Sequence, residues 1–172
     1  MDRLDRKRQQ ILDALSDAAE RGQDRLRVGQ VMTPDPACIS ADSSILDLVR
    51  LFHAKEFRHP LVTDAEGNLI GVVSDRDVIR CFGPSKYPQE EVLRGITTAE
   101  IMSTDVVTVS PEDPLEQAIE LLFGYGINCL PVVSNGRLVG ILTTTDLYVV
   151  LESLLKTLRT SPVRSVARAA AH

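Results

Sequence analysis

The chain has 172 residues, of which 44% are apolar and 25% charged, and 24 acidic against 19 basic residues give a net charge of −5. These proportions are typical of a soluble globular protein and exclude a wholly disordered chain. Because the net charge is negative, the chain lacks an overall basic field, and we do not expect nucleic acid as a partner. No apolar run approaches the roughly 18 residues of a membrane-spanning helix, so we expect no membrane span.

The amino terminus and the cysteines both predict a cytoplasmic protein. Residues 2–8 are mostly charged, whereas a secretory signal would turn apolar there. The three cysteines, Cys38, Cys81 and Cys129, form an odd set without C-x-x-C spacing. This pattern indicates reduced thiols rather than a disulfide framework or a zinc site.

Residues 1–27 are predicted to form a charged amphipathic helix that precedes the rest of the fold. Its apolar stripe is made at helical spacing by Leu4, Ile11, Leu15 and Ala18. Because the segment carries 7 basic and 6 acidic residues, we interpret it as a solvated or partner-binding helix rather than a nucleic-acid arm.

Residues 28–80 follow as a series of short elements. A helical turn at 28–32 leads to an extended piece that ends at 38–40, and a helix then carries apolar residues at Ile45, Leu48, Val49 and Phe52. Two strands, 61–63 and 69–73, are joined by a tight turn, and a closing helix begins near Asp77.

The same series returns at residues 98–155, after a linker at 81–97 that contains Gly83, Pro84 and Pro88. Its central helix is predicted to begin with Asp113 as N-cap and Pro114 at the first helical position. Strands at 131–133 and 138–142 follow, and the closing helix begins near Asp146. Residues 156–172 are interpreted as a carboxy-terminal tail.

The two series are copies of one unit. The letters VMT at 31–33 return as IMS at 101–103, and GVVSDRD at 71–77 returns as GILTTTD at 140–146. A unit of about 50 residues is too small to bury an adequate core alone. We therefore expect an α+β fold in which two β-α-β-β-α repeats pack as a pseudo-twofold pair, with an N-terminal helix outside them.

Each copy places a hydroxyl and a carboxylate at a strand-to-helix junction: Ser74 with Asp77, and Thr143 with Asp146. One interpretation is a helix cap, in which these side chains satisfy the first backbone amides. The other is a ligand site, since a carboxylate at such a junction can bind ribose hydroxyls beside a helix N-terminus that favours phosphate. The aspartate recurs in both copies while the two residues before it vary, which favours the ligand site.

These features resemble the tandem CBS-domain regulatory unit, also called a Bateman module. The resemblance covers roughly residues 28–152 and rests on the VMT and IMS openings, on HPLV at 59–62 and LPVV at 130–133, and on the two junction signatures. It implies a non-catalytic regulatory protein that binds AMP, ADP, ATP, NAD or S-adenosylmethionine in clefts between the repeats. It also implies a homodimer. We predict no cofactor besides this ligand, and the sequence does not identify the effector protein that the module regulates.

In that family the junction of one repeat faces the strand start and the residues before the proline of the other. The resemblance thus places one cleft around Ala37, Phe57, Arg58, Ile141, Thr143 and Asp146, with Arg58 near phosphate. It places the other around Val72, Ser74, Arg76, Asp77, Val107, Ile127 and Asn128, with Arg76 near phosphate. His59 replaces an apolar residue that is usual in the family, and no cation lies near Pro131, so we expect the two clefts to differ.

Two alternatives stay open. The chain could be a dimerising scaffold with empty or degenerate clefts, or a redox or metal sensor that uses Cys38 and Cys129. His53 and His59 have no acidic or thiol partner at ligand spacing, and the chain has no nucleophile elbow, Walker loop or G-x-G-x-x-G motif. We therefore predict neither catalytic residues nor a metal site.

Overall fold

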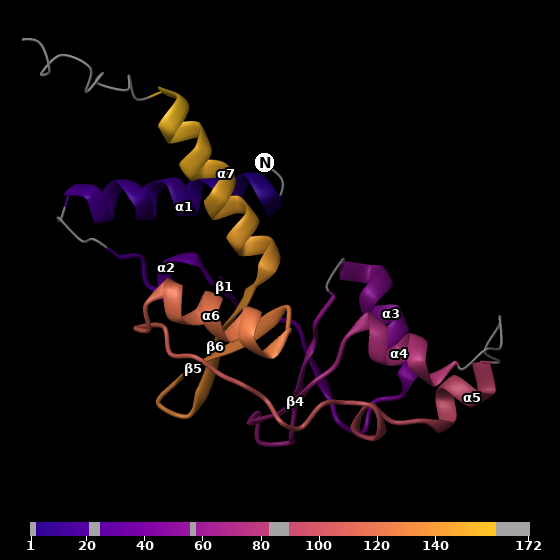
Figure 1. Cartoon of the computed structure of the whole chain (residues 1–172). Coiled ribbons are helices and arrows are strands. Elements are labelled where there is room, and N and C mark those ends of the chain that lie inside the picture. Colours follow the sequence, from indigo (N-terminus) through magenta and orange to yellow (C-terminus); the bar gives the residue numbers. More distant parts are fainter. Residues whose placement is uncertain (1–2, 21–24, 56–57, 83–89, 161–172) are drawn as a thin grey trace, which may run out of the picture.

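The computed structural model describes residues 3–20, 25–55, 58–82 and 90–160. Within these ranges the helices and strands gather into two groups (Figure 1). One group contains α1, α2, β1, α6, β5, β6 and α7, and the other contains α3, β4, α4 and α5. Phe57, the linker residues Gly83, Pro84 and Pro88, and residues 161–172 of the tail lie outside the described residues.

The first repeat follows the predicted order of elements. Its elements are α2 (Val28–Val31), β1 (Thr33–Pro34), β2 (Cys38–Ser40), α3 (Ile45–Lys55), β3 (Leu61–Thr63), β4 (Leu69–Val72) and α4 (Asp75–Cys81). In its sheet, β2 runs parallel to β3, and β4 runs antiparallel to β3.

The second repeat has longer strands in its hairpin, while Ser103 and Val109, in the segments before its central helix, form only isolated bridges. Its elements are the 3-10 helix η1 (Thr98–Glu100), α6 (Leu115–Tyr125), β5 (Cys129–Ser134), β6 (Arg137–Thr143) and α7 (Thr144–Thr160). The predicted start of the central helix was wrong: α6 begins at Leu115 with Pro114 as its N-cap. The Asp113 carboxylate instead accepts a hydrogen bond from the Ser110 N–H at 2.8 Å.

Two helices lie outside the repeats. The predicted helix, α1 (Arg3–Glu20), packs against α2 and α7; Ile11 and Ala18 of its apolar stripe are buried there, whereas Leu4 is 40% exposed. Helix α5 (Glu90–Gly95) forms within the predicted linker and packs on α3, where Leu93 joins the core of the first repeat. Helix α7 continues five residues beyond the predicted end of the second repeat.

The repeats exchange their leading segments. Strand β1 of the first repeat pairs with β6 of the second, so that Thr33 lies opposite Ile141. In return, Ser103 of the second repeat forms a bridge with Val72 on β4 of the first. Strand β1 thus joins the sheet of the second repeat, and the Ser103 bridge ties the second repeat to β4 of the first.

The glycine of each junction signature makes this exchange possible. A Cβ atom at Gly140 would lie 2.6 Å from the sulfur of Met32, and a Cβ at Gly71 would lie 2.6 Å from the sulfur of Met102. Any side chain at these glycines would therefore collide with the methionine of the VMT or IMS segment of the other repeat. A small apolar cluster then joins the repeats, with Leu61, Cys129 and Ile141 buried at its centre.

Candidate functional site

Both junctions form the helix cap that the spacing predicts. At the start of α4, the Ser74 N–H and O–H donate to Asp77 Oδ2 at 2.8 and 2.6 Å. At the start of α7, the Thr143 N–H and O–H donate to Asp146 Oδ2 at 2.7 and 2.8 Å. In both, the cap occupies one carboxylate oxygen and leaves Oδ1 for another partner, so capping does not exclude ligand binding.

The capping pattern alone does not identify the site. Ser44 and Asp47 form a similar cap at α3, where the Ser44 O–H donates to Asp47 Oδ2 at 2.6 Å, yet this pair is exposed. Asp77 and Asp146 differ from Asp47 because they follow the strands, β4 and β6, on which the repeats exchange segments. Their position at the junction of two repeats is what makes them candidates.

Asp146 is buried, and its second oxygen is occupied. The residue is 5% exposed. Its Oδ1 accepts a hydrogen bond from the Thr33 hydroxyl at 3.1 Å and forms an ion pair with the Lys7 ammonium of α1 at 2.9 Å. Thr33 belongs to the first repeat, so this junction brings both repeats and the N-terminal helix to one carboxylate.

Asp77 is more accessible, and its second oxygen is nearly unoccupied. Its side chain is 17% exposed, and Oδ1 meets only the Arg80 guanidinium at 3.5 Å among the described residues. The Arg80 side chain is itself 79% exposed and lies on the same helix. The Asp77 carboxylate therefore retains acceptor positions for a ligand.

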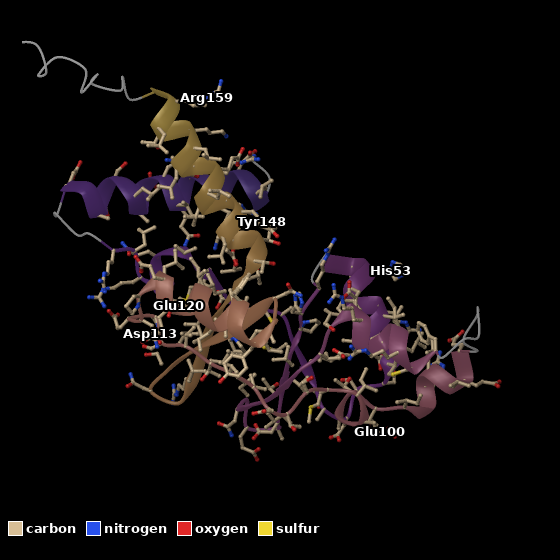
Figure 2. All side chains as sticks on the ribbon, in the orientation of Figure 1. His53, Glu100, Asp113, Glu120, Tyr148 and Arg159 are labelled. Carbon is tan, nitrogen blue, oxygen red and sulfur yellow. The ribbon has the colours of Figure 1, made fainter. Side chains whose placement is uncertain are left out.

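The other residues predicted for the Asp146 cleft lie in two places. Ile141 lies on β6 opposite Thr33, and the Ala37 carbonyl accepts the Leu61 N–H beside β2. Arg58 instead lines an open hollow of about 610 Å³ on the first repeat, with Val49, Phe52, His53, Asp75, Val78 and Ile79; Figure 2 labels His53 on α3. The assignment of Arg58 to the phosphate of the Asp146 cleft stays a prediction.

The residues predicted for the Asp77 cleft are also divided between the repeats. Val72 exchanges backbone hydrogen bonds with Ser103, at 2.9 and 3.0 Å, directly before the junction. Val107 and Ile127 pack on the core of the second repeat, and the Asn128 carbonyl accepts the Thr144 N–H at 3.0 Å. Arg76 is exposed on the first turn of α4.

Cationic side chains gather near the Asp77 junction. Burial lowers the pKa of the half-buried His59; Asp75 and Asp77 oppose this shift, and Arg58 and Arg76 add to it. Arg58 and Asp75 line the same hollow, and Arg76 and Asp77 follow Asp75 on the first turn of α4. In the part of the chain that the structure describes, neither Arg58 nor Arg76 forms an ion pair, so both are available to an anion.

The structure adds Lys7 and Thr33 to the residues predicted from sequence. Thr33 is the last residue of the VMT opening, and its repetition as Ser103 was a usable signal for a hydroxyl at this place. Lys7 had no such signal, because it is one of several cations on a predicted surface helix.

The thiols offer little reactivity. Burial raises the pKa of Cys129 to about 12, which keeps it protonated, and all three cysteines are free. Over the described residues, no group of three His, Cys, Asp or Glu side chains could hold a metal ion. None of the helices described is both long and apolar enough to cross a membrane.

The model of the family described as "CBS domain" matches residues 28–83 and 99–153. The chain belongs to the CBS-domain family. The two matched segments correspond to the two repeats, and they confirm both the predicted resemblance and the predicted α+β fold of a CBS pair.

One curated sequence and two crystal structures illustrate how similar the chain is to known proteins. The chain is 34% identical over 122 residues to an inosine-5'-monophosphate dehydrogenase from Nitrosopumilus maritimus, a match that covers 70% of this chain and 23% of that enzyme. The crystal structure of a Vibrio cholerae protein assigned to acetoin utilization (AcuB) matches with a TM-score of 0.68 at 30% identity, over 80% of this chain and 98% of that one. The crystal structure of CBSX2 in complex with AMP matches with a TM-score of 0.63 at 28% identity, over 77% of this chain and 98% of that one.

The similarity to the dehydrogenase is limited in extent. This chain spans about a quarter of the length of the first curated relatives that it matches. The similarity therefore covers a small part of those enzymes.

Proposed function

We propose that this CBS-domain pair is a non-catalytic regulatory module that binds an adenosine nucleotide, or a related adenosyl compound, in clefts between its repeats. The observation that carries the proposal is the Asp77 junction. There the cap fixes one carboxylate oxygen, while Oδ1 keeps room for ribose hydroxyls. The AMP complex of the related CBSX2 supports the adenosine class.

The charges around the Asp77 junction support a phosphate on this ligand. Arg76 is exposed on the first turn of α4, one residue before Asp77, and forms no ion pair among the described residues. A guanidinium group binds phosphate oxygens in bidentate fashion, so Arg76 favours a phosphorylated nucleoside over a free base.

Isothermal titration calorimetry with AMP and adenine tests this proposal. We expect AMP to bind the wild-type chain at least tenfold more tightly than adenine, because adenine lacks both the ribose and the phosphate. Asp77→Asn should weaken AMP binding by roughly 1.5–3 kcal/mol, the range for a charge-assisted hydrogen bond.

Asp47→Asn is the matched control, because Asp47 forms the same kind of cap away from the exchanged strands. It should leave AMP affinity unchanged. Equal affinity for adenine and AMP, or equal effects of the two variants, would contradict the proposal.

A second candidate function, a dimerising scaffold, rests on α6. Leu115, Ala118 and Leu122 of this helix are buried in the core, yet Ile119 and Phe123 are 42% and 90% exposed. Such an exposed phenylalanine favours an interface with a second copy of the chain. Light scattering on Phe123→Glu tests it: the scaffold requires a dimer that this variant dissociates, and a monomeric wild type would exclude it.

A further inference from the structure

The side chain of Lys7 is inserted from α1 against the Asp146 junction. Its ammonium forms the ion pair with Asp146 Oδ1 at 2.9 Å, and it also donates to the Val31 carbonyl and to the Thr33 hydroxyl. The Lys7 and Asp146 side chains are only 11% and 6% exposed. This ion pair is therefore largely shielded from solvent.

The contacts at Asp146 use the acceptor capacity of its carboxylate. A carboxylate has about four acceptor positions. The N–H and O–H of Thr143 occupy Oδ2, and the Thr33 hydroxyl and the Lys7 ammonium occupy Oδ1. Two ribose hydroxyls could bind this carboxylate only by displacing some of these donors.

Other contacts of α1 hold Lys7 in place. Gln10 Nε2 donates to the carbonyls of Gln30 and Met32, at 3.0 and 3.3 Å. Ile11 is fully buried in the core of the second repeat, and Arg8 pairs with Glu152 of α7 at 3.0 Å. In Figure 1, α1 lies across α7, and α2 lies below α1. The ammonium is thus part of a docked helix rather than a loose surface side chain.

We infer that α1 is an intramolecular competitor for the Asp146 cleft: Lys7 occupies the carboxylate that a ribose would bind, so nucleotide binding there and the docked position of α1 exclude each other. This inference rests on the proposed function, because it takes the ligand to be a ribonucleoside. By linkage, a nucleotide at Asp146 weakens the docking of α1 by the same factor by which α1 weakens the nucleotide. The N-terminal helix then reports occupancy of this cleft.

The experiment uses the full chain carrying Asp77→Asn, which weakens the Asp77 cleft so that binding at the Asp146 cleft can be measured. Lys7→Met removes the ammonium but keeps an apolar stem of similar length. We expect it to raise the affinity for AMP at the remaining cleft at least tenfold in calorimetry, while adenine binding stays weak. Arg8→Gln is the matched control: it removes the neighbouring exposed ion pair on α1 and should change AMP affinity less than twofold.

Hydrogen–deuterium exchange supplies a second measurement that needs no Lys7 variant. In the Asp77→Asn chain, saturating AMP should increase amide exchange across residues 3–20, because α1 must leave its docked position. An unchanged or decreased exchange rate would overturn the inference, even if Lys7→Met failed to fold.

The outcomes also separate this inference from the proposed function. If the wild-type chain binds AMP through Asp77 but Lys7→Met gives no gain at Asp146, the competitor role is wrong and the proposed function stands. If AMP binds neither the wild-type chain nor any variant, both are wrong.

Discussion

The carboxylates of Asp77 and Asp146 have the same partners at Oδ2 and different partners at Oδ1. In both, Oδ2 caps the helix through the preceding hydroxyl residue. At Asp77, the described residues give Oδ1 a single long contact, to an exposed arginine, whereas at Asp146 Oδ1 meets a buried lysine and a threonine of the other repeat. Both copies of a duplicated motif can therefore keep the same helix cap while the contacts of the second carboxylate oxygen come to differ.

The largest expected effect is on stability. Asp146→Asn removes the negative charge of the buried Lys7–Asp146 ion pair, and breaking a buried ion pair costs about 3–5 kcal/mol. Asp77→Asn changes a helix cap and should cost about 0.5–2 kcal/mol. Urea denaturation of both variants measures the difference.

The double variant Lys7→Met with Asp146→Asn is the control for this comparison. Since it removes both charges, it should recover part of the lost free energy of unfolding. Equal destabilisation by Asp77→Asn and Asp146→Asn would mean that the lysine does not distinguish the junctions.

The second effect concerns the glycines of the two signatures. A Cβ at Gly140 would lie 2.9 Å from the Thr33 carbonyl oxygen, and one at Gly71 would lie 3.2 Å from that of Ser103. We expect Gly140→Ala to cost about 1–3 kcal/mol, the usual range for overpacking, and Gly71→Ala to cost less. Thermal unfolding checks the order. Gly124→Ala should cause no loss, because a Cβ there would meet no atom of the described segments within 4 Å.

A smaller effect is expected on nucleotide selectivity. Arg76→Ala should weaken ATP several-fold at the Asp77 cleft and adenosine little, and Arg58→Ala should act in the same way at the Asp146 cleft. Titrations on Asp146→Asn and Asp77→Asn backgrounds assign each effect to one cleft. If Arg58→Ala lowered ATP affinity only at the Asp77 cleft, the assignment of Arg58 to the Asp146 cleft would be wrong. Arg50→Ala on α3 is the control for the loss of a surface charge.

The smallest effect is a pH dependence at His59. Because burial lowers the pKa of His59 in the folded state, the unfolded state binds more protons as the pH falls past the ordinary histidine value of 6.5. Folding stability should therefore decrease from pH 7.5 to pH 5.5, and His59→Gln should reduce that decrease. Denaturation of His59→Gln at the two pH values measures it.

The fold could be predicted from the sequence because each repeat carries its own local sequence patterns. Turn residues, strand-length apolar runs and the two Ser/Thr-x-x-Asp junctions lie at corresponding places in both copies, and the structure has its elements there. Helix starts were less certain: Pro114 fits either the N-cap or the first helical position by its fixed φ, and the structure uses it as the N-cap.

The environment of each carboxylate could not be predicted in the same way. Lys7 lies 139 residues from Asp146 in the chain, and only the docking of α1 brings the two charges together. Likewise, nothing in the spacing of Gly71 or Gly140 indicates that a methionine of the other repeat covers it. Local pattern predicts which atoms form a cap, but tertiary packing decides which atoms remain accessible.

The exchange of leading segments also constrains how this gene can evolve. Met32 meets Gly140, and Met102 meets Gly71, so each signature glycine is fitted to a methionine encoded in the other copy. A mutation that enlarges one glycine forces that methionine to shift, so its cost depends on residues encoded in the opposite half of the gene. After the duplication the partners of the two carboxylates came to differ, whereas each signature glycine still contacts a methionine of the other repeat.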